Sequence, residues 1–154
     1  ADALTLIAQC PALFAALHEG CILTPHGGEF ARLVPEISGQ MGGAISKEDA
    51  TSAAAAQMGC TVLLKGADTI IASPDGTVLR HEAKGARAVP WLATAGAGDV
   101  LAGLITGLLA RGMMPVDAAT YASWLHVECA LHFGPGLIAE DLTEVLPLVL
   151  RELA

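Results

Sequence analysis

The residues with the clearest chemical potential lie in a glycine-rich segment, Thr94–Asp99. An apolar stretch with helical spacing follows, so the glycines are expected at the N-terminus of a helix. Backbone amides at such an end have no partner within the helix, and the helix dipole adds positive charge there. Glycine also lets an anion approach the backbone closely. The segment therefore predicts a phosphate site, with an anion hole made by the amides of Gly96, Ala97 and Gly98.

Asp99 needs a separate explanation, because a carboxylate beside a phosphate site repels the ligand. Phosphoryl transfer requires a base that aligns an attacking hydroxyl group and accepts its proton, and Asp99 is placed for that role. The alternative is structural: Asp99 caps the helix and the glycines only turn the chain. A P-loop is excluded, because no lysine follows a glycine, and a Rossmann fingerprint is excluded by Leu101 in place of its third glycine.

Two further segments follow expected strands, where open α/β sheets bind their ligands. After the strand at 21–24, His26 could hydrogen-bond a substrate and Glu29 could hold hydrated Mg²⁺ near phosphates. The alternative is a surface loop in which Glu29 favours a helix N-terminus. After the strand at 60–64, Lys65 either reaches a nucleotide phosphate or is simply solvated, and Gly66 begins the next connection.

The order of elements predicts a layered α/β fold. Ser46 with Asp49 predicts a capping box, and Gly59 suits a helix C-terminus. Residues 73–76 fit a hairpin turn and residues 84–92 an irregular loop. Helices are expected over 3–17, 27–33, 46–58, 97–110, 115–133 and from about 140 onward, and strands over 21–24, 60–64, 69–72 and 77–81.

Composition narrows the function further. The chain has 154 residues, a net charge of −8 and a mean hydropathy of +0.55. The acidic balance argues against nucleic-acid binding, and no apolar run reaches the roughly 18 residues of a membrane span. We expect a cytoplasmic protein whose four cysteines are free, buried thiols, since none forms a C-x-x-C pair. His126 and His132 do not have metal-ligand spacing. The few strands and the start at Ala1 suggest a fragment.

The three segments, in this order, resemble the ADP/ATP-dependent NAD(P)H-hydrate dehydratases of the ribokinase-like superfamily. Ala97 departs from the family pattern, which usually has Thr there, and Gly-Ala-Gly-Asp is common among the superfamily's sugar kinases. His26 favours the dehydratases, because sugar kinases typically have Asn at its position. The likeness is carried by Ala1–Leu4, by Thr24–Phe30 (family Thr-Pro-His-x-x-Glu), by Val62–Thr69 (Leu-Lys-Gly-x-x-Thr), by Ala93–Gly103 (Gly-Thr-Gly-Asp-Val-Leu-x-Gly) and by Gly136–Leu142.

The resemblance implies a three-layer α/β/α ribokinase-like fold that is incomplete, with N-terminal strands missing and residues 1–154 forming the C-terminal part of a single domain. It implies a lyase: ADP or ATP, with Mg²⁺, phosphorylates the hydroxyl of hydrated NADH or NADPH, and phosphate elimination regenerates the cofactor. It also implies a homo-oligomer, with an epimerase domain as a further possible part of the natural chain. Two alternatives stay open: a kinase for a sugar or vitamin precursor, and an inactive piece of a larger enzyme.

The resemblance also implies roles for individual residues. Asp99 would be the base and would contact the substrate hydroxyl, and His26 would contact the hydrated dinucleotide. Glu29 would act on the metal indirectly, through water. The nucleotide site would be lined by Lys65, Gly66, Ala67, Asp68 and Thr69, together with Gly98.

Overall fold

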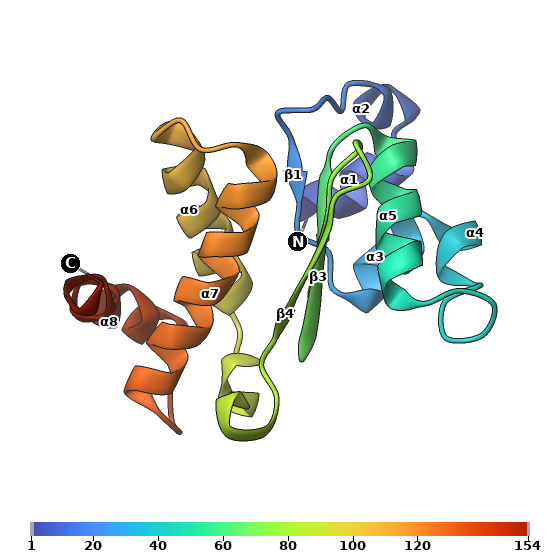
Figure 1. Ribbon diagram of the computed structural model, residues 1–154. Coiled ribbons are helices and arrows are strands. Elements are labelled where there is room, and N and C mark those ends of the chain that lie inside the picture. The colour runs from blue at the N-terminus through green and yellow to red at the C-terminus, as the bar shows by residue number, and fades with distance from the viewer. Residues whose placement is uncertain (1, 154) are drawn as a thin grey trace. The chain divides into compact units, whose positions relative to one another are not determined.

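The structure is a computed structural model that describes residues 2–153. The described chain forms two compact units that divide between residues 80 and 81, and their elements are labelled in Figure 1. Each unit has a hydrophobic core of its own. Strand β4 (Val78–Glu82) begins in the first unit and ends in the second.

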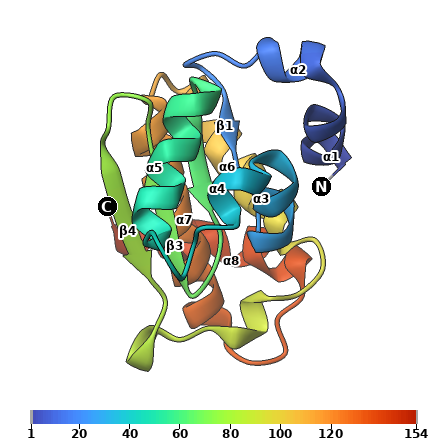
Figure 2. The same ribbon diagram turned by 90° about the vertical axis from the view of Figure 1, so that its right-hand side faces the viewer.

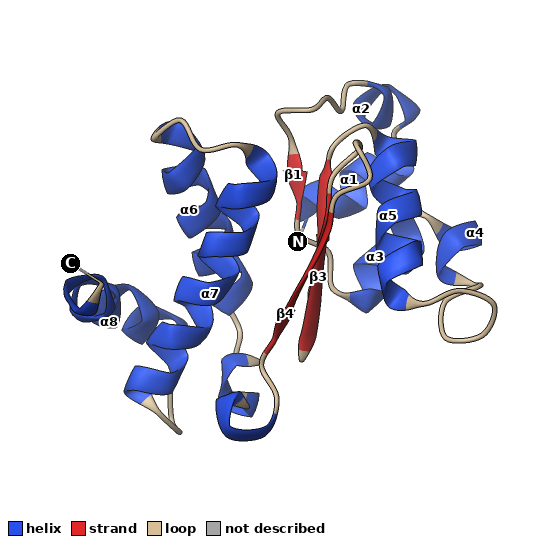
Figure 3. Cartoon of the chain, viewed as in Figure 1, coloured by secondary structure: helices blue, strands red, loops and turns tan. Residues whose placement is uncertain are grey.

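The first unit is built on a sheet, whose strands are red in Figure 3. The strands lie in the order β1-β2-β3-β4. β1 pairs with β2 in parallel, and β2 pairs with β3 antiparallel. β2 is therefore parallel to only one neighbour, because the short connection to β3 returns the chain directly. The elements of this unit are α1 (Asp2–Gln9), α2 (Pro11–Ala15), β1 (Ile22–Leu23), α3 (Gly27–Leu33), α4 (Pro35–Ser38), α5 (Lys47–Met58), β2 (Thr61–Leu64) and β3 (Asp68–Ala72), with the start of β4.

Helix α5 packs on β2 and β3 and covers one face of the sheet (Figure 2). Its buried side includes Ala50, Ala54 and Ala55, which are fully buried. These small side chains let the helix approach the strands closely. All four residues of β2 are buried, so this strand is rigidly packed.

The second unit is helical. It comprises two 3₁₀ turns, η1 (Gly85–Arg87) and η2 (Pro90–Leu92), and three helices, α6 (Ala97–Ala110), α7 (Pro115–Phe133) and α8 (Ala139–Glu152), which pack on one another. The indole N–H of Trp91 donates to the carbonyl of Ala130 at 3.0 Å, which ties η2 to α7.

The expected α/β class is confirmed, and several elements agree closely with the sequence prediction. The helices at 27–33, 97–110 and 115–133 have the predicted bounds. The Ser46–Asp49 capping box is present, and Gly59 ends α5 with φ +62°. Strands 60–64, 69–72 and 77–81 are found within one residue of prediction.

Other expectations need correction. The single helix over 3–17 is wrong: the chain breaks between α1 and α2, because Pro11 has no N–H to donate and disfavours helical backbone at Cys10. The loop over 84–92 contains η1 and η2, and α4 was missed. All four cysteines are free, but only Cys60 and Cys129 are buried. In the described residues no helix could cross a membrane. The single domain over 1–154 stays a prediction.

Candidate functional site

The segment after β1 is a reciprocal helix cap made by two of the predicted site residues. His26 is the N-cap of α3, and its Nδ1 accepts hydrogen bonds from the amides of Gly28 (3.0 Å) and Glu29 (3.3 Å). Glu29 Oε2 accepts from the His26 amide at 2.8 Å. Since Nδ1 accepts two hydrogen bonds, a neutral ring carries its proton on Nε2. The His26 side chain is 56% exposed and Glu29 only 6%, so His26 is the one available to a ligand.

The structure also brings Lys65 to this cap, as expected for residues that follow neighbouring parallel strands. The Lys65 amide donates to the Pro25 carbonyl at 2.9 Å, and Lys65 Nζ lies 3.9 Å from Glu29 Oε2. Burial acts to raise the pKa of Glu29, whereas the His26 amide and the positive charge of Lys65 act to lower it, and the net result is a lowered pKa. Glu29 is therefore a buried, ionised carboxylate that serves both as a capping residue and as a partner of Lys65.

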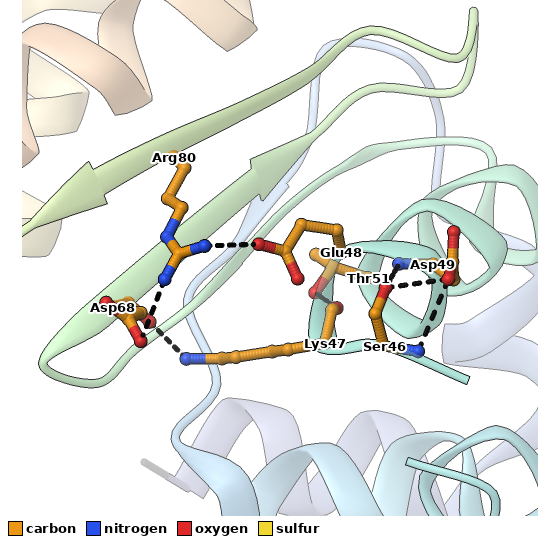
Figure 4. A network of polar contacts seen from close by, with 7 residues as sticks. All are labelled: Ser46, Lys47, Glu48, Asp49, Thr51, Asp68 and Arg80. Carbon is orange, nitrogen blue, oxygen red and sulfur yellow. Dashed lines mark hydrogen bonds and ion pairs between the residues drawn. The ribbon is translucent and has the colours of Figure 1, made fainter. Parts of the chain in front are cut away.

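The connection from Lys65 to Thr69 is held by charged residues that sequence reasoning missed (Figure 4). Lys47 donates to the carbonyl of Asp68, and Arg80 pairs with the carboxylates of Asp68 (3.3 Å) and Glu48 (3.1 Å). Asp68 is thus engaged by protein cations. If Asp68 lines a nucleotide site, as predicted, its backbone is therefore better placed to contact the ligand than its side chain.

In the second unit, the glycine-rich segment begins helix α6 as predicted. Gly96 is the N-cap with φ +84° and has no side-chain cap. The Ala97 amide makes only a long hydrogen bond, 3.4 Å, to Thr94, and within residues 2–153 the Gly98 amide has no hydrogen-bond partner. Among the described residues, none of the three predicted anion-hole amides therefore makes a short hydrogen bond to the protein, as an anion site requires.

Asp99 occupies the first turn of α6 and is exposed. Over the described part of the chain, its carboxylate takes part in no hydrogen bond or ion pair. A residue that caps a helix bonds to its first amides, so the structure gives no support to the capping interpretation. The carboxylate can instead accept a proton from a ligand.

A buried histidine fixes the start of α6. His126, in α7, is 7% exposed, and its Nε2 lies 2.8 Å from the carbonyl oxygen of Ala97. A carbonyl only accepts hydrogen bonds, so this ring nitrogen is the donor. No local sequence pattern signals this contact, because its partners lie 29 residues apart.

No group of three or more His, Cys, Asp or Glu side chains among residues 2–153 could hold a metal ion. Glu29 already has a lysine and an amide as partners. These residues fit Mg²⁺ only as an ion carried by nucleotide phosphates, with Glu29 reached through water.

Comparison with known proteins first supports the fold class. Over 86% of this chain and 49% of the other, the structure is similar to the crystal structure of an ADP/ATP-dependent NAD(P)H-hydrate dehydratase from Bacillus subtilis, with 32% identity and a TM-score of 0.74. A ribokinase-like superfamily protein from Enterococcus faecalis has a TM-score of 0.80 and 25% identity over 99% of this chain and 51% of that one. The expected ribokinase-like fold is thereby confirmed.

The family is also defined. Residues 1–147 match the NAD(P)H-hydrate dehydratase family, so the chain belongs to that family. It is 39% identical to the bifunctional NAD(P)H-hydrate repair enzyme Nnr of Moorella thermoacetica over 99% of this chain and 29% of the relative. The chain thus spans about half or less of the length of the relatives it matches.

Proposed function

We propose that this chain carries the base, the anion hole and a nucleotide-binding loop of an enzyme that dehydrates hydrated NADH or NADPH with ADP or ATP. The observation that carries the proposal is the start of α6. There, the unbonded amide of Gly98 adjoins the unpaired, exposed carboxylate of Asp99. Phosphoryl transfer to a hydroxyl needs a group that binds the phosphate beside a base that accepts the hydroxyl proton, and these two residues supply that pair. Family membership supports the hydrated nicotinamide cofactor as acceptor.

In the proposed reaction, Asp99 accepts the proton of the ring hydroxyl while its oxygen attacks the terminal phosphorus of the nucleotide. The bond from that phosphorus to its bridging oxygen breaks, and AMP leaves when ADP is the donor. The amides of Gly96, Ala97 and Gly98 stabilise the charge on the transferring group. Phosphate then leaves the ring with a neighbouring proton, which restores the double bond of the cofactor.

The remaining residues bind and orient. His26 presents Nε2 to the hydrated dinucleotide, and Lys65, Gly66, Ala67, Asp68 and Thr69 line the nucleotide site with Gly98. Mg²⁺ would neutralise the charge of the phosphates, and Glu29 would contact it through a water molecule. A homo-oligomeric state, a cytoplasmic location and an epimerase in the same natural polypeptide belong to the same proposal, the last supported by the bifunctional relatives.

The test uses the full-length polypeptide that carries this sequence. With ADP or ATP and hydrated NADH, we expect the absorbance of intact NADH to return and AMP or ADP to accumulate in step with it. No regeneration with either donor would refute the proposal.

The second candidate function is a small-molecule kinase, favoured by Ala97 in the Gly-Ala-Gly-Asp segment. Its signature would be a stable phosphorylated sugar or vitamin precursor without any NADH. Running the assay on residues 1–154 alone as well as on the full polypeptide tests the third alternative, an inactive piece, for which little or no turnover of the shorter chain is expected.

A further inference from the structure

Lys47 binds both ends of the connection between β2 and β3. It is the first residue of α5, and its ammonium donates to the carbonyl of Asp68 (Figure 4). The same ammonium donates to the carbonyl of Lys65 at 3.5 Å. The two carbonyls belong to the first and fourth residues of the segment 65–68, so one side chain fixes the direction of two peptide groups in a four-residue turn.

The orientation of these carbonyls determines that of two amides. In a trans peptide the C=O and the following N–H point in opposite directions, and the described residues contain no cis bond. With the carbonyls of Lys65 and Asp68 turned toward Lys47, the N–H groups of Gly66 and Thr69 point away from it. The side of the loop opposite Lys47 thus presents N–H groups in place of carbonyl oxygens.

We propose that Lys47 is a positioning residue for nucleotide binding: it keeps the Lys65–Thr69 loop in the conformation that turns amide donors, and not carbonyl oxygens, toward the nucleotide. This inference rests on the proposed function, which assigns the loop to the nucleotide site. Carbonyl oxygens repel phosphate, so a loop released from Lys47 loses affinity even though no residue that contacts the ligand has changed.

Gly66 provides the space that the arrangement needs. A Cβ added at position 66 would lie 2.9 Å from Lys47 Nζ and 3.2 Å from the carbonyl oxygen of Asp68. Any side chain there would push the ammonium off its carbonyls. Gly66 and Lys47 therefore act together on the loop, and substitution of either residue should weaken nucleotide binding in the same way. Thr69 Oγ1 donates to the Gly66 carbonyl at 3.0 Å, which braces the turn from within.

Arg80 offers a matched control. It is a cation of the same cluster, but it forms ion pairs with the carboxylates of Glu48 and Asp68. Its side chain is 44% exposed, so these ion pairs contribute little. If the cluster acts only through its charge, loss of Arg80 and loss of Lys47 should be equivalent. If it acts by holding backbone carbonyls, only Lys47 matters.

The experiment compares K47M, K47R, G66A, R80M and the K47M/G66A double variant of the full-length enzyme. ADP affinity is measured by calorimetry, steady-state kinetics give kcat and both KM values, and hydrogen exchange is followed over residues 65–69. We expect K47M and G66A each to weaken ADP binding about tenfold, the scale of one lost hydrogen bond to a charged group. The double variant should be no weaker than either single one, because both remove the same contact. K47R should restore affinity to within about threefold of the parent, since a guanidinium also donates to two carbonyls.

The pattern of kinetic effects separates positioning from general damage. The KM for ADP should rise in K47M, whereas kcat at saturating ADP and the KM for the hydrate should not move, and exchange at 65–69 should accelerate. A folded K47M with parental ADP affinity would overturn the inference, as would an equal loss in R80M. If K47M does not fold, K47A decides by the same criteria, because Gly66 itself belongs to the proposed nucleotide site. Absence of ADP and ATP binding by the unsubstituted enzyme is a different result, which refutes the proposed function itself.

Discussion

Replacing Gly96 by Ala tests whether the start of α6 requires glycine. Gly96 has φ +84° and ψ −20°, a backbone conformation that side chains disfavour. A Cβ at this position would also lie 2.9 Å from the Cβ of Ala139, the first residue of α8. Neither atom belongs to a flexible side chain, so relief requires movement of the backbone at one helix start or the other.

The two effects add to a substantial loss of stability. Left-handed backbone costs an L-residue about 1–2 kcal/mol. Forcing an additional carbon into a packed contact costs about 1–3 kcal/mol. We therefore expect G96A to lower the free energy of unfolding by about 2–5 kcal/mol, a large part of the ~5–15 kcal/mol typical of a domain. Any movement that relieves the contact also displaces the amides of Ala97 and Gly98, so turnover should fall together with stability.

Urea denaturation monitored by circular dichroism measures this loss, and two further variants separate its parts. A139G removes the atom that the new Cβ would meet, so the G96A/A139G double variant should recover about 1–3 kcal/mol relative to additivity. The loss of about 1–2 kcal/mol that comes from the left-handed backbone at position 96 should remain. G103A is the matched control in the same helix: no atom lies within 4 Å of its added Cβ, and it should gain about 0.5–1 kcal/mol. A G96A protein that loses less than about 1 kcal/mol would refute the geometric reasoning.

Three further substitutions test the site and its caps. D99N should reduce turnover at least about 10²-fold, the scale of a removed base, without changing the urea midpoint, because the exposed carboxylate has no partner to lose; near-parental turnover would show that Asp99 is not the base. S46A should cost about 1 kcal/mol of stability, measured by urea denaturation, because it removes the acceptor of the 3.0 Å bond from the Asp49 amide; no loss would mean that α5 does not depend on this cap. For Glu29, whose pKa is lowered from 4.5, the ionised form is favoured by folding, so its contribution is complete above the unfolded-state pKa and is lost as the pH falls through the folded-state value. The stability deficit of E29Q should accordingly be largest near pH ~7 and shrink below pH ~4 in urea midpoints taken across that range; a deficit independent of pH would contradict the assignment.

Local signals predicted much of the fold. Pro115 at the start of α7 and Gly96 before α6 mark helix ends by backbone chemistry alone, and both helices have the predicted bounds. The same chemistry at Pro11 was overlooked, because the apolar spacing continues across the break between α1 and α2. Periodicity reports which face of a helix is buried, but does not show where the backbone must stop.

The site was predicted less completely, because long-range contacts have no local signature. His26 and Glu29 were chosen for their chemistry, and the structure adds that they cap α3 reciprocally. Lys47 and His126 were not chosen. Their carbonyl partners lie 18 and 21 residues away for Lys47 and 29 residues away for His126, beyond the reach of spacing arguments.

These two missed residues share a mode of action. Lys47 and His126 each donate to main-chain carbonyls of a segment that carries a recognisable motif, the loop 65–69 in one unit and the start of α6 in the other. Under the proposed function the motif residues supply the donors and the base, whereas the side chains outside the motifs hold the carbonyls of the same segments. Binding through backbone amides depends on the orientation of the peptide planes. A side chain at such a position can be exchanged as long as that orientation is kept. Under the proposed function, Ala97 contributes only its amide to the anion hole, and its carbonyl is held by His126 of α7, so Ala can stand there in place of the Thr that the family resemblance implies.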